Sequence, residues 1–468
     1  MLRLNLEPTP GISTFSDDWT ENSGFQSIKD KIELWFDRSR SLLLEVHIIA
    51  LDRKEDCLDL ELFCSRRKMC TEIFRVLEDR MKRITSLSTR IDNSLMPPFL
   101  KPGQDENWNE FPGLRLQPNV LTELDLDLRS FNIYDGLPLD LSNSSSLKKL
   151  TVHGPNIDPD GYATCSEISL LPPPALRVLE LHRLVLRWHA DAEPFKTSVK
   201  KISIDNGWIA AELWNIFDKV FPDVEVISII EPRRTPRFWR PFDQVLEKRG
   251  ELRLPVVEKL SLTLKSWEII ERFICPRVTE LEIREGHLCS KQYTWPSDLR
   301  SVQRFLNNSD AKLTKFTITT RESRLKDIKL LLLEMPFLEE LGVDLIDGGY
   351  REDLDYEKKC LDGFLGELYE SQHGENNPNT SGSLEGVYLI CPRLDSLRFK
   401  DHSGNTFFTS QAIIDLVNTR VQGVLDGPRS KRRVDWKEIS LSISSQTLAN
   451  TNRQLCYFSA IDFSIKAI

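Results

Sequence analysis

The phrases ICPRVTELEI (residues 274–283) and ICPRLDSLRF (residues 390–399) decide the fold of this chain. In both, a proline stands two places before an apolar residue, a second apolar residue follows three places later, and a third follows two places after that. We refer to these three apolar positions as the anchors of a block. The last two anchors alternate with other residues, and such alternation predicts a short strand with one buried face.

Looser versions of the phrase recur from Leu121 onward, mostly at intervals of roughly 21 to 35 residues, close to the period of leucine-rich repeats. One such strand cannot cover its own apolar face, so it must stack on neighbouring copies. The sequence therefore predicts a repeat protein with a continuous core. The predicted anchors are Leu121, Leu124, Leu126; Leu147, Leu150, Val152; Leu176, Leu179, Leu181; Val199, Ile202, Ile204; Val224, Ile227, Ile229; Val257, Leu260, Leu262; Val278, Leu281, Ile283; Leu313, Phe316, Ile318; Leu338, Leu341, Val343; Leu394, Leu397, Phe399; and Trp436, Ile439, Leu441.

Proline is enriched two places before the first anchor of a block. It cannot extend a preceding helix, and it favours an extended chain. The stretches 211–220, 267–273 and 325–335 precede three of these prolines and have the pattern of amphipathic helices. The prolines at this position are Pro174, Pro222, Pro255, Pro276, Pro336 and Pro392.

Helix and strand alternating at this short period indicate an α/β fold, a leucine-rich-repeat-like solenoid (horseshoe) with a parallel sheet on its concave side and irregular repeats. An ordinary α/β domain whose strands begin alike is the alternative. We expect a helix or irregular segment on the outer side of each strand. The predicted parts are a flexible N-terminus (1–24), a cap of helices and strands (25–113), the degenerate repeat array (114–445) and a C-terminal cap (446–468).

Two regions of the chain depart from the repeat. In the N-terminal cap, the apolar pattern predicts helices from Phe25 and over residues 70–81, with strands over 42–51 and 84–87. Inside the array, residues 346–384 form an acidic insertion. We expect a helix there around Phe364, Leu365 and Leu368, followed by a disordered loop, SQHGENNPNTSGS.

The composition of the chain limits which partners it can attract and in which cellular compartment it is expected. The chain has 468 residues, 40% of them hydrophobic, and a net charge of -9, which gives no long-range attraction to nucleic acid or to an anionic membrane. No stretch approaches the roughly 20 apolar residues that cross a bilayer, and the N-terminus lacks the apolar core of a secretory signal. The nine cysteines are odd in number and include no Cys-x-x-Cys pair, as is typical of reduced thiols. We expect a cytoplasmic protein.

The sequence contains no motif of catalysis or cofactor binding. There is no GxGxxG phrase, no P-loop and no Gly-x-Ser-x-Gly elbow. His287 and Cys289 are the only close pairing of these two residue types, and two further ligands at metal spacing are missing. The sequence therefore predicts no enzyme activity, no cofactor and no metal site.

A proline-broken segment, EPRRTPRFWRPF (residues 231–242), is the candidate protein-binding site. Arginines beside aromatic residues have the composition of interface hot spots, and long loops often carry specificity. The alternative is that the aromatic residues pack on the next helix while the arginines stay solvated. The predicted site residues are Arg233, Arg234, Arg237, Trp239 and Arg240.

A second basic segment, GPRSKRR (residues 427–433), has the composition of a nuclear-import signal or of a contact for an acidic partner. A solvated loop is the alternative, so nuclear localisation stays open.

Residues between the anchors should form the concave face of the sheet, which can bind a polypeptide or simply keep the sheet solvated. In chain order the row passes from acidic through mixed to basic. It comprises Asp125, Asp127, Thr151, His153, Glu180, His182, Ser203, Asp205, Glu282, Arg284, Thr317, Thr319, Arg398 and Lys400.

Three segments carry a resemblance to a known family. WFDRSRSLLLEVHI (residues 35–48) is similar to a Trp-Leu-x-Arg-Ser phrase, with Phe36 in place of leucine and Leu43 in place of a usual proline. ICPRLDSLRF resembles a Cys-Pro-x-Leu-x-x-Leu block, and SQAIIDLVNTR (residues 410–420) resembles a helix ending near Ser-Arg, with Thr419 in place of serine. Over roughly residues 27–445 the chain resembles the F-box and leucine-rich-repeat proteins of mushroom-forming fungi.

The resemblance implies the substrate-recognition part of an SCF-type ubiquitin ligase, in which an F-box docks to a Skp-type adaptor. The F-box, a helical module of the Leu-Pro-x-Glu-Ile type, should precede Trp35, and no such phrase does so in this sequence. Either the F-box has been lost or it lies upstream of Met1. We expect a non-catalytic module that binds a protein or peptide target. The alternative is an F-box-less leucine-rich-repeat scaffold or decoy with no ubiquitin-ligase role.

Overall fold

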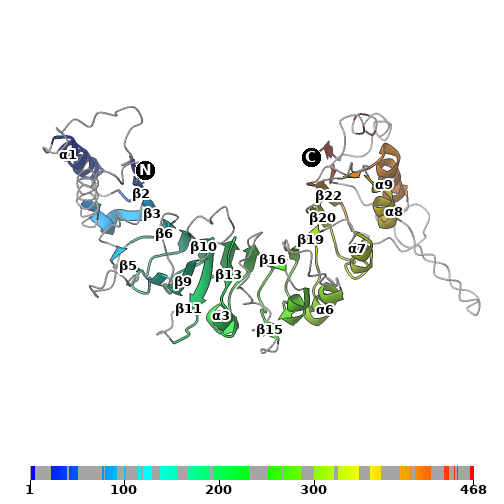
Figure 1. Cartoon of the computed structure of the whole chain (residues 1–468), viewed down its shortest axis with the longest axis horizontal. Helices are drawn as coiled ribbons and strands as arrows, with labels where there is room; N and C mark the ends of the chain where they lie inside the picture. The colour runs from blue at the N-terminus through cyan, green and yellow to red at the C-terminus, as the bar shows by residue number, and fades with distance from the viewer. Residues whose placement is uncertain are drawn as a thin grey trace, which may run out of the picture. The chain divides into compact units, whose positions relative to one another are not determined.

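The computed structural model describes most of the predicted blocks and leaves several connecting segments undescribed. Contacts divide the chain into two compact units, Met1–Gly250 and Glu251–Ile468, and each contains a parallel sheet (Figure 1). The fold is therefore of the mixed α/β class, as predicted. The described residues are 2–5, 23–39, 42–50, 76–77, 80–91, 100–101, 114–116, 120–128, 137–154, 166–188, 193–230, 251–264, 267–285, 300–320, 325–346, 359–369, 391, 393–402, 406–422, 437–441, 447, 449, 451 and 464–467.

The main sheet of the first unit is parallel and follows the order of the chain. Neighbouring strands place anchor opposite anchor: Leu150 lies opposite Leu179, and Val152 opposite Leu181. The alternation of apolar and polar residues fixes this register, because a slip by one residue would expose every anchor. In spatial order the strands are β1 (Leu2–Asn5), β2 (Leu44–Ala50), β3 (Ile84–Ile91), β6 (Glu123–Asp127), β8 (Lys149–His153), β10 (Val178–His182), β12 (Lys201–Asp205) and β14 (Val226–Ile230).

A second sheet occupies the segments between the anchor strands of the first unit. The sequence predicts helices or irregular segments there, and for these segments the prediction is wrong. The strands pair in parallel, except that β4 and β5 are antiparallel. They are β4 (Leu100–Lys101), β5 (Leu114–Leu116), β7 (Leu137–Asp140), β9 (Ser166–Leu171), β11 (Leu184–Trp188) and β13 (Trp208–Ile209).

Few helices occur in the described part of the first unit. The predicted helix from Phe25 and the strands over 42–51 and 84–87 are confirmed by α1 (Ser23–Arg38), β2 and β3. The single helix predicted over 211–220 is instead two short ones, α3 (Ala211–Trp214) and α4 (Phe217–Val220). A 3-10 turn, η3 (Met81–Arg83), precedes β3, and most of the helix predicted over 70–81 lies outside the described residues.

The second unit is also built on a parallel sheet in chain order. Its register again places anchors opposite each other, with Leu281 opposite Phe316 and Ile283 opposite Ile318. The strands are β16 (Lys259–Leu264), β18 (Glu280–Glu285), β19 (Lys315–Thr320), β20 (Glu340–Leu345), β22 (Ser396–Asp401), β24 (Glu438–Leu441) and β25 (Ser464–Ala467). Two short parallel pairs accompany them, β15 (Leu252–Arg253) with β17 (Phe273–Ile274) and β21 (Lys359–Cys360) with β23 (Thr406–Phe407).

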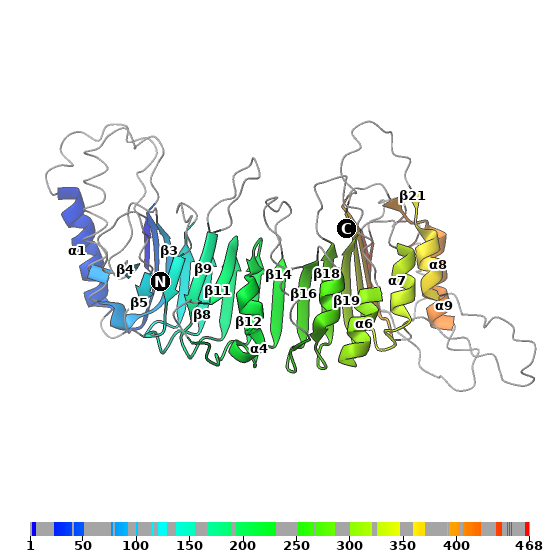
Figure 2. The same ribbon diagram turned by 60° about the horizontal axis from the view of Figure 1, so that its bottom comes forward.

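Helices connect the later strands of the second unit and lie together along one side of its sheet (Figure 2). Predictions over 325–335, around Phe364 and over 410–420 are confirmed by α7, α8 and α9. The helix predicted over 267–273 is wrong, because that segment forms a 3-10 helix followed by β17. The helical elements are η5 (Trp267–Arg272), α6 (Arg300–Ser309), α7 (Leu325–Leu332), α8 (Asp362–Tyr369) and α9 (Ser410–Gln422).

The anchors form the core of both units. Every predicted anchor that the structure describes is at most 2% exposed; Trp436 lies outside the described residues. Helix faces complete the core in the second unit, for example through Phe305 of α6 and Leu365 of α8. The blocks found in the sequence are therefore core strands.

The two cysteines of the repeated phrase are buried structural residues. Cys275 is fully buried, and its backbone N–H donates to Ser309 Oγ at 3.0 Å. Cys391 has a positive φ of 49°, and its Sγ contacts Leu332 O at 3.4 Å. Cys275 directly follows β17, and both cysteines lie shortly before an anchor strand.

Cys275 is expected to resist alkylation in the folded protein. Burial raises the pKa of its thiol to about 12, and the thiolate is the reactive form. Incubation with iodoacetamide near neutral pH followed by peptide mass mapping should leave Cys275 unmodified, whereas the same treatment in urea should modify it. Modification of Cys275 at equal rates in both conditions would contradict the buried position.

No helix among the described residues is long and apolar enough to cross a membrane. The domain division proposed from sequence stays a prediction, although β1 lies within the N-terminus that we expected to be flexible.

Candidate functional site

The candidate site chosen from sequence cannot be placed. Arg233, Arg234, Arg237, Trp239 and Arg240 lie outside the described residues, as do the basic segment 427–433 and the loop 371–383. These assignments stay predictions. The surface that the structure does describe is the polar face of each sheet, by which we mean the side opposite the anchors.

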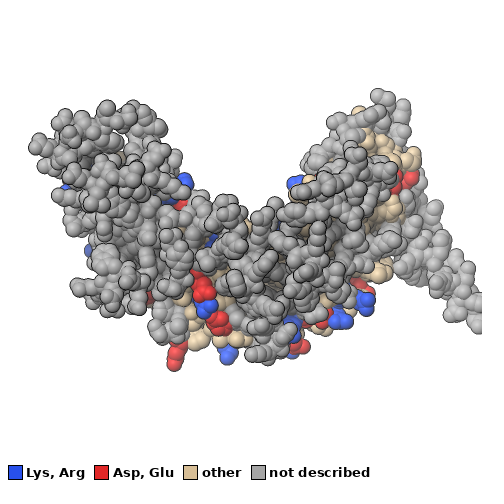
Figure 3. Space-filling model, in the orientation of Figure 1, with Lys and Arg blue, Asp and Glu red and all other residues tan. Residues whose placement is uncertain are grey.

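The predicted row of polar residues lies on this polar face, but part of it is covered. Asp127, Thr151 and Thr317 are buried, whereas Asp205 and Arg398 keep about half of their side chains accessible (43% and 52%). Arg90 on β3 pairs with Asp127, and Glu180 on β10 accepts a hydrogen bond from Thr151, so longer side chains of neighbouring strands contact two of these residues. On the side of the molecule drawn in Figure 3, the described acidic and basic residues are interspersed.

The centre of the polar face in the first unit is a row of four side chains that we name the histidine row: Asp125, His153, His182 and Asp205. The two imidazole rings stack, with centroids 4.4 Å apart and planes within 6°. His153 Nε2 lies 3.4 Å from Asp125 Oδ1, and His182 Nδ1 lies 3.5 Å from Asp205 Oδ2. Each imidazole therefore has a carboxylate beside it and a second ring against its face.

Register explains why these residues meet. His153 and His182 each follow the third anchor of their block, at the ends of β8 and β10, and the pairing of these strands places them directly opposite. Asp205 is opposite His182 on β12 in the same way. Register thus brings His153, His182 and Asp205 into one line, whereas Asp125 on β6 lies opposite Thr151 and its carboxylate meets His153 diagonally.

A second polar cluster lies beside the histidine row. Glu180 bridges two lysines, with Lys201 Nζ 2.7 Å from its Oε1 and Lys149 Nζ 3.2 Å from its Oε2. Thr151 Oγ1 also donates to Glu180 at 3.4 Å. Burial alone would raise the pKa of Glu180, but the hydrogen bonds and charges of Lys201 and Lys149 outweigh it and lower the pKa below its ordinary value.

Glu180→Gln is expected to lower the free energy of unfolding by about 1 kcal/mol at neutral pH, as for a partly buried ion pair. A carboxylate whose pKa is lowered on folding stabilises the fold above its unfolded pKa, and that stabilisation is lost as pH falls through the folded value. Urea unfolding at neutral and acidic pH should therefore show a difference between variant and parent that disappears in acid.

The matched control is Glu225→Gln, which removes a more exposed carboxylate whose ion-pair partner among the described residues is Lys200, at 2.9 Å. It should have a smaller effect, roughly 0.3 kcal/mol. Equal losses for the two variants, or a loss at Glu180 that persists in acid, would count against the bridge.

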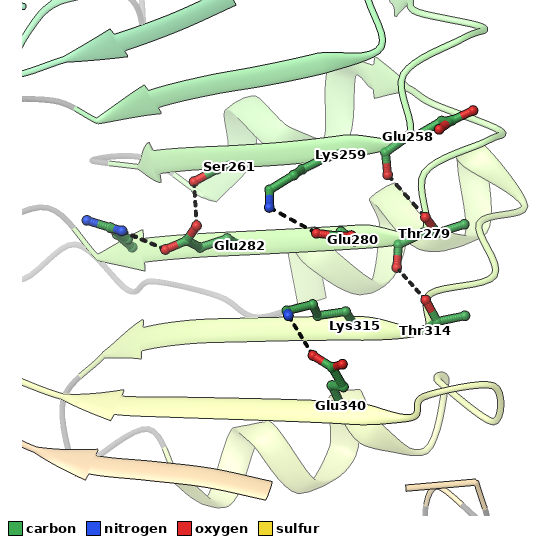
Figure 4. Close-up of polar contacts among 10 residues, drawn as sticks. Glu258, Lys259, Ser261, Thr279, Glu280, Glu282, Thr314, Lys315 and Glu340 are labelled. Atoms are coloured by element: carbon green, nitrogen blue, oxygen red, sulfur yellow. Dashed lines mark hydrogen bonds and ion pairs between the residues drawn. The ribbon is translucent and has the colours of Figure 1, made fainter. Parts of the chain in front are cut away.

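Ion pairs also join neighbouring strands on the polar face of the second unit (Figure 4). Lys259 Nζ lies 3.0 Å from Glu280 Oε2, and Lys315 Nζ lies 2.5 Å from Glu340 Oε2. These pairs occupy equivalent positions on β16, β18, β19 and β20, directly before the second anchor. Opposite charges on adjacent strands hold the register and leave this line of the face electrically balanced.

The next line of that face centres on Glu282. It accepts hydrogen bonds from Arg284 at 2.7 Å and from Ser261 Oγ at 2.9 Å. Burial would raise the pKa of Glu282, but Arg284 and Ser261 outweigh it, and the pKa is lowered. Further along, Gly342 leaves a gap over which Thr317 and Arg398 extend, and Arg398 Nη2 lies 3.4 Å from Asp344 Oδ2.

The side chains of this face provide hydrogen-bond donors, hydrogen-bond acceptors and charges of both signs. They repeat from one strand to the next. Within the ranges described, no group of three or more histidine, cysteine, aspartate or glutamate side chains is arranged to hold a metal ion. Sequence reasoning named the members of the histidine row but missed Lys149 and Lys201. The signal was present, because both lysines stand directly before the second anchor of their blocks.

Comparisons with known proteins identify no relative: no protein-family model matches the sequence, and no curated protein is significantly similar to it.

Proposed function

We propose that this chain is a non-catalytic protein-binding module, built as an irregular leucine-rich-repeat-like solenoid, whose polar sheet face binds a polypeptide target. The observation that carries the proposal is the in-register array of polar side chains on successive parallel strands. An ordinary globular sheet covered by helices on both faces would have apolar residues on both. Here only one face carries the anchors, and the other presents charges and hydrogen-bonding groups.

The proposal extends to the cellular role. The three segments that resemble F-box and leucine-rich-repeat proteins support a part in substrate recognition for an SCF-type ubiquitin ligase. A scaffold or decoy without ligase function would use the same face. Binding of a target and docking to a Skp-type adaptor are therefore separate questions, and one experiment should address both.

Site-specific photo-crosslinking tests the binding face. A benzophenone amino acid is placed at Ser203 on the polar face of β12, and in the matched control at Ser169 on β9 of the second sheet. Both serines are half-buried and lie on strands of the same unit. We expect polypeptide adducts in cells at Ser203 and few at Ser169. Equal adduct yields at both positions, or none at Ser203, would overturn the proposed face.

The ligase role is tested by purifying this chain from the same cells and identifying the proteins that co-purify with it by mass spectrometry. Recovery of a Skp or cullin component together with the target supports substrate recognition within a ligase. Recovery of targets without either component would remove the ligase role and leave the binding module.

A further inference from the structure

The residues directly before the first anchors form a line at the end of the sheet where the anchor strands begin. In the second unit, four successive blocks place three cations and one aromatic residue there, before the neighbouring strands β18, β19, β20 and β22. Backbone hydrogen bonds keep the register at this end, for example from the N–H of Glu339 to the carbonyl of Thr314 at 2.8 Å. It is the end of the strands at which Figure 4 labels Thr279 and Thr314. We name the four residues the entry line: Arg277, Lys312, Phe337 and Arg393.

The ring of Phe337 is contacted by two cations. Arg393 Cζ lies 5.0 Å from the ring centroid, and Lys312 Nζ lies 5.7 Å from it. Since β20 lies between β19 and β22, the two cations come from the blocks on either side of the ring. Both cations are exposed and the ring is half-buried. The attraction between a cation and an aromatic face therefore holds two long side chains in place at the surface.

An aromatic ring orients a cation but does not cancel its charge. Among the described residues, no carboxylate forms an ion pair with Lys312 or Arg393, whose printed contacts are those with the ring. Arg277, in contrast, pairs with Glu258 at 3.1 Å. The centre of the entry line thus has two exposed positive charges that an anionic partner can engage.

The carboxylates nearest to the entry line in the chain do not occupy these two cations. Asp395 pairs with Lys437 at 2.7 Å, and Glu334 accepts a hydrogen bond from Gln303 at 2.8 Å. Within the ranges described, two further carboxylates also form no ion pair with the cations over the ring: Asp310 and Glu339. These acidic groups weaken any long-range attraction, so an anionic partner must contact the two cations directly.

The basic character of the entry line is not required by the fold. The first unit builds the same kind of parallel sheet, and none of its residues directly before a first anchor is positively charged. Those residues are Val120, Ser146, Ala175, Ser198 and Asp223. The cations of the second unit therefore point to binding, because strand stacking proceeds without them.

We propose that the entry line of the second unit binds an acidic segment of a polypeptide, with Lys312 and Arg393 pairing with its carboxylates and the ring of Phe337 contacting the segment between them. This surface lies at the end of the strands, so the inference goes beyond the binding by the polar face proposed above. Two cations and one ring match a segment with a few carboxylates. A nucleic acid has a negative charge at every phosphate and is repelled more strongly by the chain's net charge of -9.

The test uses the full chain and two synthetic peptides, one with glutamates in a Ser/Gly background and one with glutamines at the same positions. Fluorescence anisotropy with an uncharged dye at low ionic strength measures the dissociation constants. We expect the glutamate peptide to bind about tenfold more tightly than the glutamine peptide. Its affinity should fall several-fold in about 0.3 M salt, because exposed ion pairs are screened.

Three variants separate the causes. K312Q/R393Q should weaken binding of the glutamate peptide about tenfold, as the loss of two exposed ion pairs would. Phe337→Leu keeps an apolar side chain without the aromatic face, and should weaken binding about threefold. The control K148Q/K219Q removes two exposed lysines of the first unit, and hence the same charge, and should leave binding unchanged. Circular dichroism checks that each variant is folded.

Four results would each overturn the inference: equal loss in the control, equal affinity for the two peptides, tighter binding of an oligothymidylate than of the glutamate peptide, or no binding of the glutamate peptide. Failure here is distinguishable from failure of the proposed function. Adducts at Ser203 report on the polar face, and they would persist if the entry line bound nothing.

Discussion

Phe399→Ala is expected to destabilise the second unit by about 3–5 kcal/mol, the range for truncating a buried phenylalanine to alanine. Phe399 is the third anchor of its block and is fully buried on β22. Its ring lies 4.8 Å from that of Phe408, edge to face, and 5.7 Å from that of Phe364 on α8. Truncation would leave a cavity where a strand, a helix and the segment after β23 meet.

Hydrogen exchange should locate this loss. Amides of β20 and β22 should lose protection in the variant, and urea unfolding should show an earlier transition. The matched control is Lys400→Ala, the next residue on the same strand, which is exposed and should change the free energy of unfolding by less than about 0.5 kcal/mol. Unchanged protection of β22 in Phe399→Ala would contradict its place in the core.

Gly207→Ala is expected to destabilise the first unit by about 2–3 kcal/mol, as overpacking against backbone does. Gly207 lies in the turn between β12 and β13, after Asn206, whose φ is 55°. A Cβ here would overlap the carbonyl oxygen of Leu184, with Ile204 Cγ2 at 2.9 Å. Backbone at Leu184 cannot move away without disturbing the pairing of β11 with β9 and β13.

Thermal unfolding of the Gly207 variant should be compared with Gly363→Ala. Gly363 lies in α8, and a Cβ there would meet no atom within 4 Å. Alanine favours a helix over glycine by up to about 1 kcal/mol, so this variant should be neutral or stabilising. A Gly207 variant as stable as the parent would show that the turn can open, and would contradict the close approach.

The anchor strands could be predicted because their signal is local and repeated. Alternating apolar residues with a fixed spacing specify a strand with one buried face, and eleven copies specify the stacking partner. The second sheet of the first unit could not be predicted in this way. Segments such as LPLD and LVLRW are too short for a period, and their strand form depends on pairing with the next turn of the chain. Likewise, WEIIER has a helical pattern but only six residues between fixed strands, and it forms a 3-10 helix.

The candidate site could be predicted in part. Aligning the blocks at their anchors places His153 and His182 at the same position after the third anchor, so their proximity follows from register. The stacking of the rings and the bridge from Glu180 to Lys149 and Lys201 depend on side-chain rotamers, which a sequence pattern does not specify. The assignment of binding to residues 233–240 stays a prediction. The same photo-crosslinking amino acid, placed within this segment, would test it.

The register between strands has a consequence for the length of the segments that connect them. β20 and β22 pair residue for residue although residues 346–395 lie between them, and β18 and β19 do so across residues 286–314. Closing a loop twice as long costs only about 0.6 kcal/mol more, so strand pairing is almost indifferent to the length of the connection. We therefore expect that additional sequence between two neighbouring strands of this sheet costs little of their pairing free energy.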